Sequence, residues 1–191
     1  MDLFDGATIS YTQARQGGAG TCYIMATMAA SAEFPDLIKN IFITPTKNSA
    51  GIIGLRLYIR GRPWVVSIDD YLLFRLANTL KFAYPSTNLK AIWGAVLEKA
   101  WAKVKGNYLN AEGGLNQNGL RSFIGYPVFS YMTSAITNTA DTFTMIKAAD
   151  NLKYVMAAST SGSGNDQQTN SCGIAMSHAY SMIAAFQMTD A

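Results

Sequence analysis

The sequence predicts an α+β fold, and three observations support this class. A stretch rich in Ala and Met from Cys22 to Phe34 indicates one helix, and an amphipathic pattern from Asn88 to Gly106 indicates another. Residues 51–68 alternate between apolar and other residue types with a period of two, as in a β-hairpin. Helices also precede the strands expected in the last third, which favours α+β over a parallel α/β fold.

The first expected helix begins at Cys22 and stops before Pro35. Its only β-branched aliphatic residue is Ile24, and a glycine-rich loop, Gly17 to Gly20, comes just before it. The sequence therefore places Cys22 in the first turn of a helix.

The expected hairpin has a clear turn and two alternating arms. The turn is 60–63, Arg-Gly-Arg-Pro, and the second arm is 64–68. The apolar positions of the first arm are Ile53, Leu55, Leu57 and Ile59.

The second expected helix follows Asn88, which we assign as its N-cap, and ends at Gly106. Its apolar residues recur at spacings of three and four, which indicates one buried face. Trp93 and Trp101 lie on that face and are expected to anchor the core.

The last third is expected to contain a short helix from about Asp141 and two strands, 154–158 and 178–186. The tract 159–170, rich in Ser, Gly, Asn and Gln, is expected to be a loop. A boundary near Gly125 would divide the chain into subdomains 1–125 and 126–191.

Composition excludes several classes of protein. The 191 residues are 49% apolar and 14% charged, and the net charge of +3 is spread without runs of like charge. Disorder is thereby excluded, and nothing indicates a nucleic acid partner or an anionic membrane. The uncharged stretch 16–32 is too short and too rich in glycine to span a membrane. Two distant cysteines indicate free thiols in an intracellular, cytoplasmic compartment.

Few residues are suited to catalysis. The chain has one histidine and two cysteines, and it lacks zinc, phosphate-loop and dinucleotide motifs. A Cys–His pair remains, with Cys22 favoured as nucleophile because a helix N-terminus stabilises a thiolate. Gln16 and the loop amides would form an oxyanion hole. The alternatives are that Cys22 is a small buried residue and that His178 is a core histidine.

Five sequence blocks, in order, resemble the calpain family. Residues 16–23, QGGAGTCY, resemble its nucleophile motif Q-G-x-x-G-D-C-[WY], and 66–71, VSIDDY, resemble V-x-[IV]-D-D-[YR]. Residues 93–103, WGAVLEKAWAK, resemble W-x-x-L-L-E-K-A-[YF]-A-K. Gly113-Gly114 matches a glycine pair, and 177–181, SHAYS, resembles G-H-A-Y-[ST].

The resemblance implies a papain-like fold with a helical Cys-bearing lobe and a β-rich His-bearing lobe. It implies endoproteolysis of protein or peptide substrates through an acyl-enzyme, with no cofactor required for the chemistry. Cys22 would be the nucleophile, His178 the general base and Gln16 the oxyanion donor, while the backbone at Gly114 would hold the substrate.

Departures from the family pattern keep a second function open. The third catalytic residue, an asparagine in an N-P-[WF] motif, would fall beyond Ala191, and the second lobe lacks most of the strands that a β-barrel-like lobe needs to close its edges. We expect a piece of a longer protease whose incomplete lobe offers a surface to protein partners. The alternative is a catalytically inactive calpain-like scaffold or binding module, and a transglutaminase-like enzyme fits less well. Thr21 stands where the family pattern has an Asp, and Ser177 stands where it has a Gly.

Calcium regulation is left open by the resemblance. Glu98 matches a first-lobe Ca²⁺ ligand, but Gln13 stands where an Asp ligand is expected, and a hard cation prefers anionic oxygens. The alternative is that Glu98 lies on the helix surface and is a partner of Lys99 or Lys103. Asp69 and Asp70 are neighbours on a strand and would point to opposite faces, which argues against a two-carboxylate hydrolase.

Overall fold

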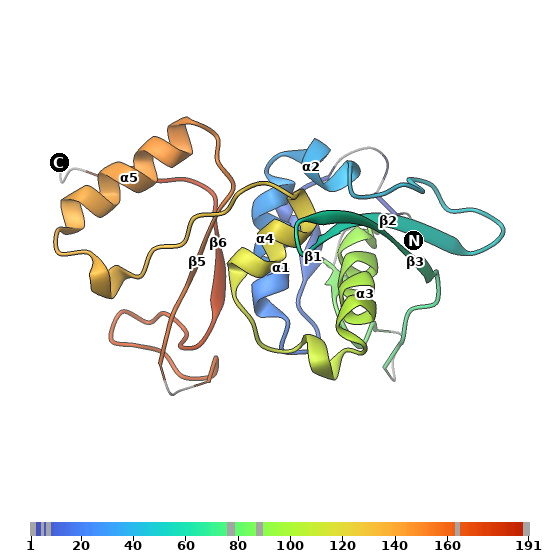
Figure 1. Ribbon diagram of the computed structural model, residues 1–191. Coiled ribbons are helices and arrows are strands. Elements are labelled where there is room, and N and C mark those ends of the chain that lie inside the picture. The colour runs from blue at the N-terminus through green and yellow to red at the C-terminus, as the bar shows by residue number, and fades with distance from the viewer. Residues whose placement is uncertain are drawn as a thin grey trace.

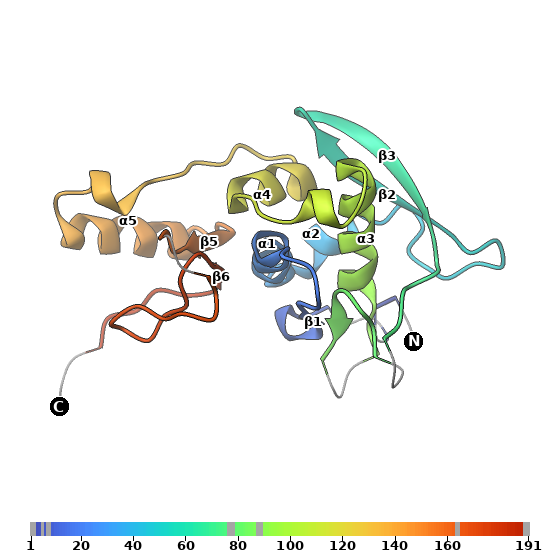
Figure 2. The ribbon, with the colours of Figure 1, turned by 90° about the horizontal axis from the view of Figure 1, so that it is seen from below.

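A computed structural model describes residues 3–4, 6, 9–75, 79–86, 90–162 and 165–188. It is built of helices and small antiparallel sheets, which confirms the α+β class. The elements of the first two thirds gather on one side of helix α1, and those of the last third gather on the other (Figure 1). A view from below shows the same arrangement, with α1 in between (Figure 2).

Helix α1, Cys22–Ala32, lies at the centre of the molecule. Nine of its eleven residues are buried, as expected for a helix that is apolar on all sides. The helix is shorter than the predicted range 22–34, because a second helix, α2, begins at Pro35 and ends at Lys39. Pro35 occupies the first turn of α2, where its missing N–H costs no hydrogen bond.

The predicted hairpin is present as β2, Ile52–Ile59, and β3, Arg62–Asp69. The strands pair antiparallel, with Ile52 opposite Asp69 and Ile59 opposite Arg62. Arg60 and Gly61 turn the chain with positive φ angles of 52° and 76°, as two-residue hairpin turns require. The apolar residues Leu55 and Leu57 are fully buried.

Helix α3, Trp93–Lys105, is the predicted amphipathic helix. Trp93 and Trp101 are buried on its inner face, as predicted. It ends at Gly106, whose φ of 101° favours glycine. It starts later than the predicted range, and the predicted cap, Asn88, lies outside the described residues.

Helix α4, Asn116–Ile124, was not predicted. Its glycine and asparagine residues have low helix propensity, so the local sequence favours a loop. Packing against α1 outweighs this preference: a Cβ atom at Gly119 would lie 2.4 Å from Thr27 Oγ1, so glycine lets the two helices approach closely. Gly125 ends α4 in the left-handed conformation.

The last third contains α5, Thr139–Asn151, and a two-stranded antiparallel sheet of β5, Met156–Ser159, and β6, Ala179–Met182. The helix and both strands were predicted, but β6 is shorter than 178–186. Ser159 is the last residue of β5, and the rest of the described part of 159–170 is a loop, as predicted, with one isolated β-bridge at Thr169. Side chains of α5 are not buried, and Asn138 caps the helix by accepting from the Ala140 amide.

Five short elements complete the described chain. These are η1, Tyr11–Gln13; η2, Leu109–Ala111; η3, Thr133–Ala135; and a ladder of β1, Ala14–Arg15, with β4, Tyr84–Pro85. No helix in the described part of the chain is long and apolar enough to cross a membrane.

Candidate active site

Cys22 is the first residue of α1, as predicted, and carries a free, half-buried thiol. A tight turn precedes it, in which the Thr21 amide donates to Ala19 O at 2.8 Å. A side chain at this position faces the amides of the first helical turn and the positive end of the helix dipole. This is a favourable location for an anionic nucleophile.

The loop before Cys22 is held closely against another segment of backbone. The Gly18 amide donates to Lys81 O at 2.8 Å, and a Cβ atom at Gly17 would lie 1.9 Å from Phe82 O. Glycine is therefore required at position 17. The Gln16 side-chain Nε2 donates to Ala19 O at 2.9 Å, which places this amide across the loop that leads to Cys22.

Gly114 lies beside the first turn of α1. A Cβ atom there would lie 2.7 Å from the ring of Tyr23, the residue after Cys22. Tyr23 is fixed in turn, because its hydroxyl donates to Ala111 O at 2.9 Å and accepts from Trp101 Nε1 at 2.8 Å. Burial is the largest influence on Tyr23 and raises the pKa of its hydroxyl. The exposed residue Gly114 therefore lies against the side chain that follows the candidate nucleophile.

Glu112 was not singled out from the sequence, yet it contacts the same loop. Its Oε1 accepts a hydrogen bond from the Gly20 amide at 3.2 Å, and the Gly113 amide donates to Gly20 O at 2.9 Å. An exposed glutamate beside two glycines looks in sequence like a solvated loop residue, so no sequence signal identified it.

His178 precedes β6 and is partly buried, with 25% of its side chain exposed. Its ring packs edge-on against Tyr180, with centroids 5.1 Å apart. The preceding residue, Ser177, has a φ of 47°, in the region that favours glycine. The backbone conformation therefore accounts for the glycine expected at this position.

The structure packs the strand after His178 against the helix that starts at Cys22. Ser181 Oγ donates to Ala26 O at 2.9 Å, and Asn116 Nδ2 on α4 donates to Ala158 O on β5 at 2.8 Å. Within the described residues, no hydrogen bond or ion pair joins Cys22 to His178. The elements that carry the two residues are thus in contact, although no hydrogen bond joins the described thiol and imidazole.

Glu98 is fully buried, so the prediction that it is a surface partner of Lys99 or Lys103 is wrong. Its carboxylate accepts hydrogen bonds from Thr21 Oγ1 and, at 2.7 Å, from the Ala83 amide. Burial raises the pKa of Glu98, and these two hydrogen bonds partly oppose the shift. Thr21, where the family has an Asp, supplies a hydroxyl donor to Glu98.

These residues do not fit a calcium ion. Both oxygens of Glu98 already accept hydrogen bonds, from Thr21 Oγ1 and the Ala83 amide. Gln13 is uncharged and buried, and its Oε1 accepts from Trp93 Nε1 at 2.8 Å and from the Ser10 amide at 3.0 Å. Across the described residues, no group of three or more His, Cys, Asp or Glu side chains is placed to bind a metal.

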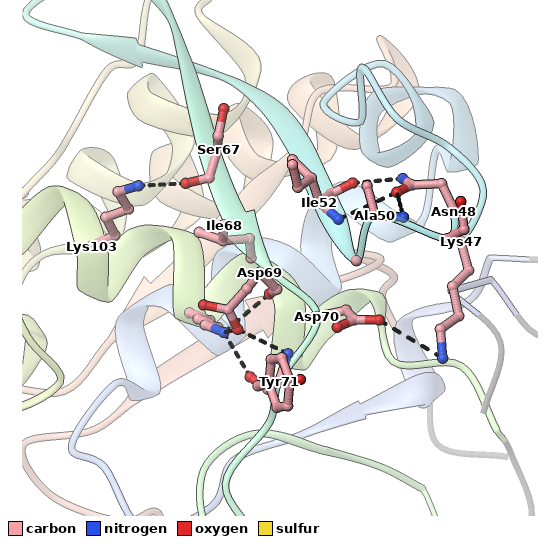
Figure 3. A pocket seen from close by; sticks show the side chains of 13 residues that line it. Lys47, Asn48, Ala50, Ile52, Ser67, Ile68, Asp69, Asp70, Tyr71 and Lys103 are labelled. Carbon is pink, nitrogen blue, oxygen red and sulfur yellow. Dashed lines mark hydrogen bonds and ion pairs between the residues drawn. The ribbon is translucent and has the colours of Figure 1, made fainter.

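A pocket of about 820 Å³ lies elsewhere, between the base of the hairpin and α3 (Figure 3). Lys99 Nζ donates to Tyr71 O at 2.6 Å and pairs with the Asp69 carboxylate, while Lys47 faces Asp70 at 3.8 Å. Asp69 and Asp70 thus pair with different lysines, as expected if the two neighbouring carboxylates point to opposite faces of the strand. The lining of this pocket includes none of the four candidate site residues. The amines of Lys99 and Lys47 already have acceptors.

Comparison with known proteins places the chain among cysteine proteases. A family model described as calpain family cysteine protease matches residues 2–191. The calpain-type cysteine protease DEK1 of Zea mays is 29% identical over 186 residues, covering 95% of this chain and 8% of that protein. A calpain of Schistosoma mansoni is 28% identical over 177 residues, covering 90% and 23%. The calpain-1 catalytic subunit of Macaca fascicularis is 34% identical over 128 residues, covering 64% and 17%. The chain thus spans less than a quarter of these relatives.

Proposed function

The chain belongs to the calpain family of cysteine proteases, and on this basis we propose that it carries the nucleophile and base of an endopeptidase. The Cys22 thiol transfers its proton to the His178 imidazole, and the thiolate attacks the carbonyl carbon of a peptide bond. The tetrahedral intermediate collapses when the C–N bond breaks and the imidazolium gives its proton to the leaving amine. Water then hydrolyses the thioester, which regenerates the thiol.

Placement of Cys22 at the start of α1 is the observation that carries this proposal. The developing oxyanion needs donors close to the carbonyl, and Gln16 together with the amides of the first helical turn can supply them. Gly114 has no side chain to obstruct a substrate backbone that passes the exposed loop beside Tyr23. Substrates of this class are proteins or peptides.

The proposal is tested with a peptidyl electrophile directed at cysteine proteases. We expect Cys22→Ala to abolish labelling, because the other free thiol, Cys172, is an exposed loop residue with no helix N-terminus next to it. Cys172→Ala is the matched control and keeps full labelling. His178→Ala lowers the labelling rate at least tenfold if the imidazole is the base. Labelling that follows Cys172, or none in a folded protein, would contradict the proposal.

A catalytically inactive calpain-like scaffold is the second candidate function. The observation in its favour is that no hydrogen bond or ion pair joins the described Cys22 and His178 side chains. Running the labelling reaction with and without Ca²⁺ separates the two functions. A protease labels under at least one condition, whereas a scaffold labels under neither. A calcium effect, if found, would have to arise away from Glu98, whose oxygens are already engaged.

We also propose that residues 1–125 and 126–191 are two subdomains of this protease core. The left-handed residue Gly125 at the end of α4 and the position of α5, β5 and β6 across α1 support this division. Exposed apolar residues in the second part, such as Phe129 and Met132, support a protein partner there. Two unpaired cysteines support an intracellular location.

A further inference from the structure

The loop that follows η2 lies against the start of α1. The Gly113 amide donates to Gly20 O at 2.9 Å, and the Tyr23 hydroxyl donates to Ala111 O at 2.9 Å. These two contacts are made on either side of Cys22 in the sequence, so they hold the loop beside the candidate nucleophile. Gly20 is two residues from Cys22, and their Cα atoms are therefore at most about 7 Å apart.

Glu112 is the charged residue of this loop, and its side chain lies over Gly20. Its Oε1 accepts from the Gly20 amide at 3.2 Å, and a Cβ atom at Gly20 would meet the Cβ, Cγ and Cδ atoms of Glu112 at 3.4–3.6 Å. Both residues are exposed. None of the ion pairs among the described residues includes Glu112, so no neighbouring lysine, arginine or histidine in that part of the chain neutralises its charge.

We propose that Glu112 selects substrates with a basic side chain at the residue whose carbonyl Cys22 attacks, an inference that rests on the proposed protease function. That residue must bring its carbonyl carbon to the Cys22 thiol, so its side chain begins close to Gly20 and to the carboxylate above it. A lysine or arginine side chain is long and flexible enough to reach an exposed carboxylate, and its charge is attracted to it. An acidic side chain is repelled.

The neighbouring glycine favours the acyl side of the scissile bond over the leaving side. Gly114 has no side chain to obstruct the substrate backbone that we propose to pass it, and it is two residues from Glu112 in the same loop. The stretch of substrate that lies along this loop therefore presents its side chains to Glu112. The carboxylate takes no part in the proton transfers of the proposed reaction.

A purely structural role for Glu112 can be separated from a role of its charge. The hydrogen bond from the Gly20 amide needs an oxygen acceptor, which the side-chain amide of a glutamine also provides. Attraction of a basic side chain needs the negative charge. Glu112→Gln therefore keeps the contact with the loop and removes the selectivity.

The test compares peptidyl electrophiles that differ only in the residue attached to the reactive group, which is lysine, norleucine or glutamate. We expect the wild type at low salt to react with the lysine probe about fivefold faster than with the uncharged norleucine probe, and more slowly with the glutamate probe. Glu112→Gln should lose the preference for lysine, and Glu112→Lys should prefer the glutamate probe. Asp36→Asn removes the same charge in α2, which follows the opposite end of α1, and as the matched control keeps the preference.

The ratio of two rates within one protein is unaffected by a variant that is less active with every probe. The preference of the wild type should also weaken as the ionic strength rises, because the carboxylate is exposed. Equal rates with the lysine and norleucine probes, or a preference that survives in Glu112→Gln, would overturn the proposal and leave the protease function standing if Cys22→Ala still abolishes labelling. A folded wild type that reacts with none of the probes would contradict the protease function and the proposal with it.

Discussion

Glu98 shows how one buried carboxylate joins separate segments beneath the nucleophile. Its two oxygens bind Thr21, the residue before Cys22, and the Ala83 amide, next to the Phe82 carbonyl that packs on Gly17. The side chain comes from α3, so the helix and both segments meet at one group. We infer that Glu98 stabilises the loop before Cys22.

Replacing Glu98 tests this role. Glu98→Ala removes the acceptor of two buried donors and leaves a cavity, so it should lower the free energy of unfolding by about 2–4 kcal/mol. Glu98→Gln should cost less, because its amide oxygen can accept from Ala83 and its amide nitrogen can donate to Thr21 Oγ1. Chemical denaturation measures both values, and equal stability of all three proteins would contradict the inference.

The raised pKa of Glu98 also predicts a pH dependence of stability. The folded protein holds the proton of Glu98 more tightly than the unfolded chain, in which the pKa is near its ordinary value of 4.5. As the pH rises above that value, the unfolded state loses this proton first and becomes relatively more stable. The free energy of unfolding should therefore fall with rising pH until folded Glu98 ionises, and Glu98→Gln should remove this part of the slope. Denaturation curves measured at several pH values give this slope. A Glu98→Gln variant with the same slope as the wild type would contradict the assignment of the slope to Glu98.

At the scale of elements, Gly119 determines how closely α4 packs on α1. Adding a Cβ atom at Gly119 would force it to within 2.4 Å of Thr27 Oγ1 and 3.2 Å of Ile24 Cδ1. We expect Gly119→Ala to destabilise the fold by about 1–3 kcal/mol through overpacking, although alanine is the better helix former. Asn118→Ala, at an exposed neighbouring position of α4, should be neutral or slightly stabilising. A Gly119→Ala variant as stable as Asn118→Ala in denaturant would show that α4 packs more loosely.

The same helix shows where sequence analysis was insufficient. Helices α1 and α3 and the hairpin could be predicted because their apolar periodicity is strong and glycine or proline marks their ends. Helix α4 could not, because its stability comes from close contact with α1, which involves residues nearly a hundred positions away. Cys22 was identifiable from its place at a helix start, whereas the role of Glu98 depends on Thr21 and Ala83, which are distant in the sequence. A charged residue in an amphipathic pattern is normally expected to be exposed, so the sequence did not indicate that Glu98 is buried.

At the scale of the whole molecule, stability should be unevenly distributed between the two sides of α1. Helices α1 and α3 bury most of their residues, whereas no residue of α5 is buried. The second part contacts the first through β5 and β6, with hydrogen bonds from Ser181 to Ala26 O and from Asn116 to Ala158 O. Elements with few buried contacts open at a lower free energy than the core.

Hydrogen exchange under native conditions tests this distribution. Amides of α5 should exchange at least tenfold faster than those of α1 and α3, because α5 can open while the core stays folded. Ser181→Ala, which removes a hydrogen bond between β6 and α1, should accelerate exchange in β5 and β6 and leave α3 unchanged. Thr144→Ala, at a side chain that bonds only within α5, is the matched control and should leave β5 and β6 unaffected. Uniform exchange across α1, α3 and α5 would instead mean that the chain unfolds as one cooperative unit. In that case the segment around His178 could not open independently of the helix that carries Cys22.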